Sequence, residues 1–215
     1  MKRRDFSVAG VALAASPWFS TSAQAQGKKP EPGTDYLALD KSAPVEATAG
    51  RIEVVEFFWY SCSHCNAFEP TLDAWAKRLP KDVHFRRVPV AFRDDFVPQQ
   101  RLYYALEAME LVDKLQSKVF YAIHVERLSL NRAETIIEWV GKQGVDLAKF
   151  SEQYNSFSVA SKASRATQLQ NAYKVEGVPA LGIGGRFYTD GSLAKNMQRA
   201  LQVTDFLIAE IRQKR

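Results

Sequence analysis

The chain has 215 residues, of which 46% are hydrophobic and 25% are charged. These values are ordinary for a soluble globular protein, and the length allows one sizeable domain or a domain with a large insertion. The formal net charge of +5 is small for this length, and Lys and Arg are scattered along the chain. Nucleic-acid binding is therefore disfavoured, and no nucleic-acid partner is expected.

Residues 1–25 predict a cleavable secretory signal peptide. Residues 2–4 form a positive start, a short apolar run follows, and Ala23-Gln24-Ala25 fits a cleavage site. The apolar run is too short to span a bilayer comfortably, which argues against a membrane anchor. Because Arg3-Arg4 also resembles a twin-arginine signal, that route and the ordinary Sec route both stay open. The mature protein is expected in an oxidising compartment, the bacterial periplasm.

The next segments predict alternating strands and a helix. Residues 26–35 indicate a flexible leader, and residues 36–39 fit a short first strand. Residues 52–60 form a nearly continuous β-branched and aromatic run, which predicts a central strand covered on both faces. A helix that begins near Cys62 and a strand at residues 83–90 then complete a β-α-β unit, the motif of a parallel strand pair.

From about residue 98 to residue 165, apolar side chains recur at helical spacing. This periodicity predicts a helical block placed between strands of an α/β domain. Asn131 with Glu134 fits a capping box, and Asp146 fits the cap of the following helix.

The last part of the chain returns to β-structure. Residues 180–183 and 186–188 flank Gly184-Gly185 and predict a hairpin. Residues 193–211 predict a closing amphipathic helix. Strands therefore lie on both sides of the helical block.

Cys62 and Cys65 are the only cysteines in the chain, and their spacing is Cys-x-x-Cys. A disulfide across two intervening residues closes almost no loop, so stabilisation of the fold explains the pair poorly. Zinc normally needs four ligands, and His64, His84 and His124 show no ligand spacing. A redox-active pair is the favoured interpretation, with a metal clip and an inert structural pair as the alternatives.

The local context suggests different roles for the two cysteines. Cys62 follows a strand and opens a helix, where free N–H groups and the helix dipole favour a thiolate, so it is the expected nucleophile. Cys65 lies one turn into the helix and is expected to be buried and to act as the resolving thiol. His64 can stabilise the Cys62 thiolate, which would make the disulfide a stronger oxidant.

The segment from Phe57 to Cys65, followed by Phe68 and Glu69, resembles the active site of the DsbA family of bacterial periplasmic dithiol oxidases. The resemblance covers nearly all of the mature chain, including the placement of the helical block. It implies a thioredoxin-like α/β fold with an inserted all-helical domain. The family's usual dipeptide between the cysteines is Pro-His, and Ser63 replaces the proline here, which bears on the redox potential and not on the reaction class.

Further positions take an expected role from this resemblance. Val178-Pro179 matches a loop with a cis proline, which faces the active-site disulfide and offers backbone groups to an extended substrate peptide. Glu56 matches an acidic residue buried beneath the disulfide, where it would accept a proton or tune Cys65. The alternative for Glu56 is an outward-facing side chain with a surface partner. Pro70 matches the kink proline of the active-site helix.

The other aromatic residues are assigned to packing. Trp75, Trp139 and Phe150 recur at helical spacing and are expected in the core. Trp59 and Tyr60 come just before Cys62, so a substrate surface and core packing both stay open for them.

The expected organisation is a thioredoxin-like domain at residues 36–95 and 166–215, with the helical domain at residues 96–165. A substrate thiolate would attack a Cys62–Cys65 disulfide at Cys62, with no bound cofactor and no metal. Expected partners are reduced or unfolded exported proteins and, by resemblance, a DsbB-like quinone-linked membrane protein that reoxidises the pair. A monomer is expected.

Two functions other than dithiol oxidation stay open for the cysteine pair. The first is a disulfide isomerase or reductase. Isomerases of the DsbC type have an N-terminal dimerisation domain, for which the roughly 25 residues between the signal and the catalytic strand leave no room. The second is a metal-binding carrier that uses the same thiols.

Overall fold

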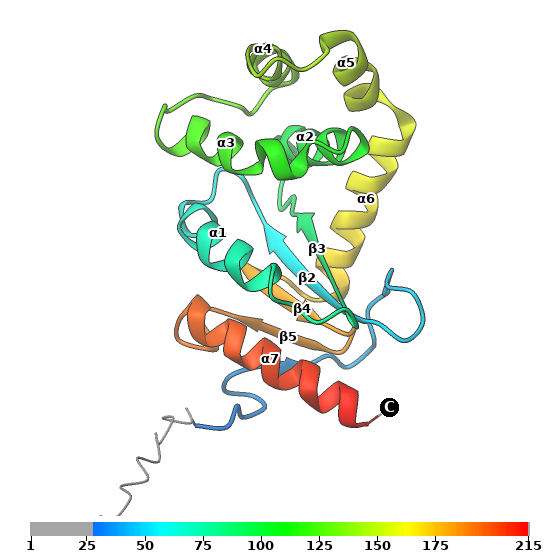
Figure 1. Ribbon diagram of the computed structural model, residues 1–215, viewed down its shortest axis with the longest axis vertical. Helices are drawn as coiled ribbons and strands as arrows, with labels where there is room; N and C mark the ends of the chain where they lie inside the picture. Colours follow the sequence, from blue (N-terminus) through cyan, green and yellow to red (C-terminus); the bar gives the residue numbers. More distant parts are fainter. Residues whose placement is uncertain (1–27, 215) are drawn as a thin grey trace, which may run out of the picture.

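The computed structural model describes residues 28–214 (Figure 1). The expected signal peptide and the first part of the leader lie outside these residues. No helix within residues 28–214 is long and apolar enough to cross a membrane.

The described residues form a five-stranded mixed sheet in the order β1-β5-β4-β2-β3. Strand β2 pairs with β3 in parallel, and the other neighbouring pairs are antiparallel. The strands are β1 (Leu37–Ala38), β2 (Ile52–Phe58), β3 (Val83–Pro89), β4 (Ala180–Ile183) and β5 (Phe187–Asp190). The expected hairpin at the end of the chain is therefore confirmed as β4 and β5.

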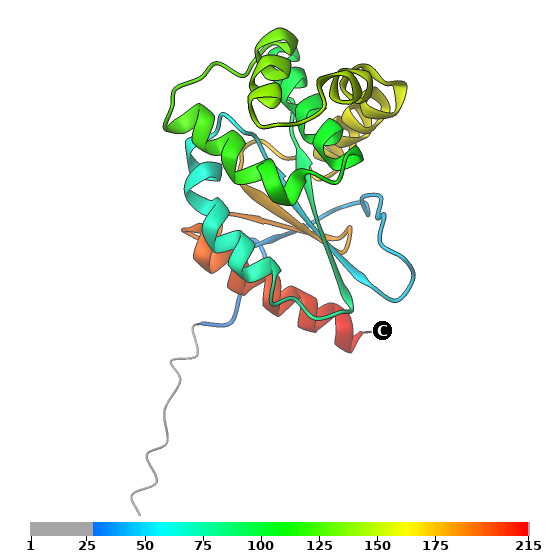
Figure 2. The same ribbon diagram turned by 45° about the horizontal axis from the view of Figure 1, so that its top comes forward.

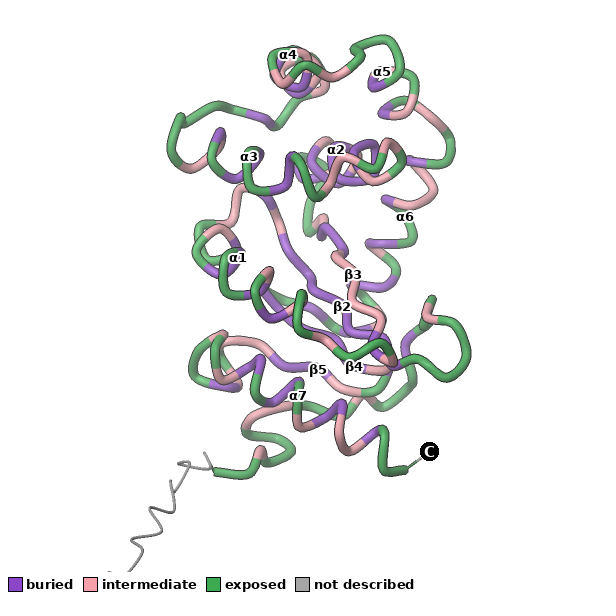
Figure 3. Tube along the Cα trace, viewed as in Figure 1, coloured by how far each residue is buried: buried purple, intermediate pink, exposed green. Residues whose placement is uncertain are grey.

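Strand β2 lies inside the sheet between β4 and β3, and every residue from Ile52 to Phe58 is buried, as its apolar run predicts for a strand covered on both faces (Figure 3). Helix α1 (Ser63–Ala76) carries the chain from β2 to β3, which confirms the expected β-α-β unit. The strand ends at Phe58 and not at Tyr60, because the chain then turns, and Cys62 N–H donates to the Trp59 carbonyl over 3.0 Å. This turn delivers Cys62 to the start of α1.

Two separate cores lie on the two faces of the sheet. Helices α1 and α7 (Met197–Gln213) cover one face, where Leu72, Leu181 and Leu207 are fully buried together. The inserted helices cover the other face, which includes Phe57 and Tyr173. Alternation of side chains along β2 therefore contributes to both cores, as expected for a strand covered on both sides.

The helices between β3 and β4 gather at one end of the sheet (Figures 1 and 2). They are η1 (Asp94–Phe96), α2 (Val97–Ala108), α3 (Val112–His124), α4 (Ala133–Lys142), α5 (Leu147–Asn155) and α6 (Phe157–Ala172). Helix α6 continues past residue 165, where the sequence placed the end of the inserted domain, and runs back alongside the sheet. The insertion thus shares a continuous helix with the chain that returns to β4.

The predicted cap of α5 is confirmed, and the predicted starts of α4 and α7 are wrong. Asp146 caps α5, because its carboxylate accepts from the backbone N–H groups of Ala148 and Lys149. The capping box expected at Asn131 is wrong, since α4 begins one residue later, and the Asn131 side chain accepts from the Ser129 hydroxyl instead. The closing helix begins at Met197 and not at residue 193, because Asn196 provides its cap.

Candidate active site

Cys62 is the N-cap of α1, with an extended backbone (φ −81°, ψ 117°). Its sulfur accepts a hydrogen bond from the Cys65 backbone N–H over 3.3 Å. Cys62 is half-buried and Cys65 is fully buried, so one sulfur can be reached from solvent and the other cannot. Both residues are free thiols, so the structure describes the dithiol form of the pair.

The pKa values of the two thiols are shifted in opposite directions, because their surroundings differ. Hydrogen bonding from the Cys65 thiol lowers the pKa of Cys62 to about 6, helped by the backbone N–H groups of Cys65 and His64 and opposed by burial. Burial is the main cause that raises the pKa of Cys65 well above its ordinary value. At pH 7 a group with a pKa near 6 is about nine-tenths ionised, so Cys62 is mostly thiolate while Cys65 keeps its proton.

His64 is exposed, between the two cysteines. Its charge also lowers the pKa of Cys62, as the smallest of the named causes. The start of the helix therefore contributes more to the acidity of Cys62 than the histidine side chain does, as expected where free N–H groups face an anion.

The Val178–Pro179 segment lies directly against Cys62. The peptide bond between these residues is cis. In its protonated form, the Cys62 thiol donates to the Val178 carbonyl oxygen over 3.3 Å, and this contact joins residues 116 positions apart in the sequence. The loop before β4 and the start of α1 thus form one surface around the reachable sulfur.

Glu56 belongs to a buried cluster of charges behind the cysteines. Its side chain is 1% exposed and lies 3.2 Å from Nε of Arg87, and Arg87 Nη2 also donates to Glu69 Oε1 over 2.8 Å. The outward-facing alternative for Glu56 is therefore wrong. Burial raises the pKa of Glu56 to about 8, although Arg87 opposes this. The Glu56 charge in turn raises the pKa of Cys65, so the cluster and the buried thiol interact.

Arg87 is a residue of this cluster that the sequence reasoning missed. It lies directly opposite Glu56 in the parallel register of β2 and β3. Two strands that are otherwise mostly apolar each carry charged residues, and this is the signal that could have paired them. Without the register, the sequence does not indicate which Arg faces which Glu.

The aromatic residues near the motif divide between core and surface. Tyr60 is fully buried, with its ring edge-on to Phe58 and Phe120, so it belongs to the core. Trp59 is half-buried and stacks on Phe96 with ring centroids 3.9 Å apart. The other predicted core aromatics, Trp75, Trp139 and Phe150, are buried as expected.

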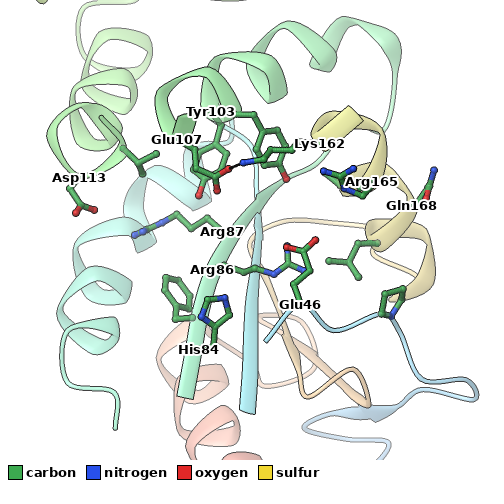
Figure 4. A pocket seen from close by; sticks show the side chains of 16 residues that line it. Glu46, His84, Arg86, Arg87, Tyr103, Glu107, Asp113, Lys162, Arg165 and Gln168 are labelled. Atoms are coloured by element: carbon green, nitrogen blue, oxygen red, sulfur yellow. Dashed lines mark hydrogen bonds and ion pairs between the residues drawn. The ribbon is translucent and has the colours of Figure 1, made fainter. Parts of the chain in front are cut away.

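A separate pocket of about 610 Å³ lies along the edge of β3, between α2 and α6 (Figure 4). Arg86 and Arg87 contribute to its lower part, and Lys162 and Glu107 form an ion pair of 2.6 Å in its upper part. Its lining includes neither cysteine and not Pro179. Within residues 28–214, no cluster of three or more His, Cys, Asp or Glu side chains could hold a metal ion.

Comparison with known proteins agrees with this geometry. A family model described as the DSBA-like thioredoxin domain matches residues 53–202. The thiol:disulfide interchange protein DsbA of Bordetella parapertussis is 44% identical over 206 residues, which cover 95% of each chain. The protein of the same name from Burkholderia cepacia is 39% identical over 193 residues, 90% of this chain and 91% of that one.

Solved structures give the same result at the level of the fold. The crystal structure of Pseudomonas aeruginosa DsbA has a TM-score of 0.82 and 37% sequence identity, and the match covers 86% of this chain and 96% of that chain. The oxidoreductase DsbA from Xylella fastidiosa has a TM-score of 0.80 at 28% identity, with 86% and 98% covered. The chain therefore belongs to the DsbA-like thioredoxin family and is a thiol:disulfide oxidoreductase.

Proposed function

We propose that the protein is a periplasmic dithiol oxidase that introduces disulfide bonds into exported proteins through Cys62 and Cys65. The observation that carries the proposal is the unequal placement of the two sulfurs: Cys62 is a half-buried N-cap whose sulfur accepts from the Cys65 backbone N–H, and Cys65 is fully buried. This placement lowers the pKa of Cys62 and raises that of Cys65. A stabilised thiolate stabilises the dithiol form, and a stable dithiol makes the corresponding disulfide a strong oxidant.

In the oxidising direction, a substrate thiolate attacks the sulfur of Cys62 in the Cys62–Cys65 disulfide. The bond between the two enzyme sulfurs breaks, a mixed disulfide forms at Cys62, and the electron pair leaves on Cys65. A second substrate thiolate then attacks the substrate sulfur of the mixed disulfide and expels Cys62 as a thiolate. The substrate loses two electrons and gains a disulfide, and the enzyme gains the same two electrons as a dithiol.

Glu56 is the proposed proton partner of Cys65 in this sequence. The Cys65 thiolate is formed in a buried site that disfavours charge, so it needs a proton promptly. A carboxyl with a pKa of about 8 is mostly protonated at neutral pH, and it can supply or accept that proton. His64 assists by favouring the Cys62 thiolate that leaves in the second step.

The proposed substrate site is the surface formed by Cys62 and the Val178–Pro179 loop. Its support is the direct contact between the Cys62 sulfur and the Val178 carbonyl, because an extended peptide held along this loop would have its own sulfur beside Cys62. Reduced or unfolded exported proteins are the proposed substrates, since exchange at a surface thiol requires an accessible substrate cysteine.

The remaining parts of the proposal concern location and partners. The signal-like residues 1–25 support export to the periplasm by the Sec or the twin-arginine route. Regeneration of the disulfide requires an oxidant, and a DsbB-like quinone-linked membrane protein is the proposed one. The proposed domain division remains residues 36–95 and 166–215 around the inserted helices at 96–165.

Two assays test the proposed activity. The oxidised protein should convert a reduced two-cysteine peptide to its disulfide faster than it repairs a protein with scrambled disulfides. Cys65→Ser should accumulate a mixed disulfide at Cys62, and Cys62→Ser should form none with the same peptide. Efficient repair of the scrambled protein with no oxidation of the peptide would instead identify an isomerase.

A further inference from the structure

The turn that presents Cys62 is held from outside the thioredoxin-like part of the chain. Residues 59–61 connect β2 to α1, and three side chains from the inserted helices α2 and α3 hydrogen-bond to this turn. Helix α3 packs beside α1, so the contacts come from a neighbouring element (Figures 1 and 2). These three hydrogen bonds take no part in the thiol exchange or in the contact between Cys62 and the Val178–Pro179 loop.

Gln99 of α2 is 2% exposed, and its amide is held in one orientation. Its Nε2 donates to the Ser61 hydroxyl oxygen over 2.7 Å and to the Leu130 carbonyl oxygen over 3.0 Å. Because a carbonyl can only accept, the Leu130 contact fixes which end of the amide faces Ser61. Among the described residues, the buried Gln99 Oε1 has no hydrogen-bond partner, which is unfavourable. The amide therefore keeps an orientation that serves its two donor contacts and leaves its oxygen unpaired.

His124 is the last residue of α3, and its ring reaches the main chain of the same turn. Its Nε2 lies 2.8 Å from the Tyr60 carbonyl oxygen, two residues before Cys62. Since the carbonyl accepts, Nε2 must carry the proton. The Tyr60 hydroxyl in turn donates to Gln116 Oε1 of α3 over 2.6 Å. Main chain and side chains of the turn are thus both attached to the inserted helices.

We propose that Gln99 and His124 are positioning residues that hold the turn at residues 59–61 so that the Cys62 sulfur faces the first N–H groups of α1. The inserted helices would then tune the redox centre in addition to covering the sheet. The inference rests on the proposed role of Cys62 as the reacting thiol, but it does not depend on whether the net reaction is oxidation or isomerisation.

The physical link is the pair of residues that precedes Cys62. His124 holds the Tyr60–Ser61 peptide through its carbonyl oxygen, and Gln99 holds the Ser61 side chain, so the two contacts restrict how the chain enters the N-cap residue Cys62. If the turn is released, the sulfur can move away from the Cys65 N–H, which is 3.3 Å away in the structure. Loss of a hydrogen bond to a charged form raises the pKa of that group, so the Cys62 thiolate becomes less stable.

The test compares three substitutions in the full-length mature protein. His124→Leu removes the donor to Tyr60, and His124→Gln keeps an N–H group near the position of Nε2. Ser61→Ala removes the acceptor of Gln99 with almost no change of volume. His84→Leu and Ser158→Ala are the matched controls, because His84 lies opposite Glu53 in the sheet and Ser158 is exposed in the first turn of α6, so both belong to other parts of the described chain than the turn.

The readouts are the midpoint of the thiolate titration, followed by ultraviolet absorbance of the reduced protein, and the equilibrium with a glutathione buffer. His124→Leu and Ser61→Ala should each raise the midpoint by about half a pH unit or more and make the disulfide less oxidising, and His124→Gln should restore both values. The controls should match the wild type.

An unchanged midpoint in both His124→Leu and Ser61→Ala, with the proteins folded by circular dichroism, would overturn the inference. The same conclusion would follow if the controls moved the midpoint as far. If the wild-type protein itself failed to oxidise peptides while these shifts occurred, the proposed function would be wrong and the positioning role would stand.

Discussion

Replacement of Glu56 by Gln should remove a pH dependence of stability that the buried carboxyl creates. Glu56 is 1% exposed, and burial raises its pKa from the ordinary 4.5 to about 8. A folded-state pKa above the unfolded value means that the folded protein binds the proton more tightly. The stability from this group is therefore fully present below pH 4.5 and is lost as the pH rises through about 8.

The size of the effect follows from the two pKa values. Raising a carboxyl pKa from 4.5 to about 8 corresponds to about 5 kcal/mol of stability lost between acid and alkaline pH, with about 3 kcal/mol of it lost by pH 7. Glutamine has nearly the same shape but no proton to lose. The free energy of unfolding of wild type minus that of Glu56→Gln should therefore fall steadily from acid to alkaline pH.

The assay is denaturant unfolding of both proteins in the dithiol form at a series of pH values across this range. Both proteins keep Cys62, whose lowered pKa acts in the opposite direction with pH, so the difference between them isolates Glu56 together with its interaction with Cys62. Parallel stability curves for the two proteins would refute the assignment of a protonated, buried Glu56.

Three further predictions concern the same centre. Alkylation of reduced Cys62 should have a half-maximal rate near pH 6, and an ordinary half-point near pH 8 to 9 in a rapid-mixing assay would contradict the thiolate assignment. His64→Ala should raise that half-point less than Ser61→Ala does. The histidine charge is the smallest of the named causes that lower the pKa of Cys62, whereas Ser61→Ala should weaken the larger contribution of the backbone N–H groups. A larger rise for His64→Ala would contradict this ranking. Tyr60→Phe should lower the free energy of unfolding by about 1–3 kcal/mol, because it leaves Gln116 Oε1 buried without its donor, and equal stability to wild type in denaturant titrations would count against that bond.

The sequence predicted the parts of the molecule that local patterns encode. The apolar run at residues 52–60 indicated a strand buried on both faces, and β2 has that character. The position of Cys62 between a strand and a helix indicated a lowered pKa, and the structure gives it. The run of β2 marks its burial by its own apolar composition, and the contacts that lower the pKa of Cys62 come from residues within three positions of it.

Local sequence patterns could not predict the contacts between segments that lie far apart in the chain. Glu56 was singled out, but its partner Arg87 depends on the register of β2 and β3. His124 lies 64 positions from the carbonyl that it binds, and Gln99 lies 38 positions from Ser61. No periodicity in the sequence marks such pairs, because they follow from how the inserted helices dock on the sheet.

The ends of elements were predicted less well than their existence. The cap expected at Asn131 moved to Arg132, and α6 continued through residue 165, where the sequence suggested a domain boundary. Competing side-chain hydrogen bonds decide such ends, as the Ser129 to Asn131 contact does before α4.

The equilibrium between the Cys62–Cys65 pair and a glutathione redox buffer tests the central claim most directly. The dithiol form should predominate even in buffers oxidising enough to keep ordinary structural disulfides fully formed, because the Cys62 thiolate stabilises it. A pair that stays in the disulfide form until the buffer is strongly reducing would contradict the proposed oxidase function and would indicate a reductase.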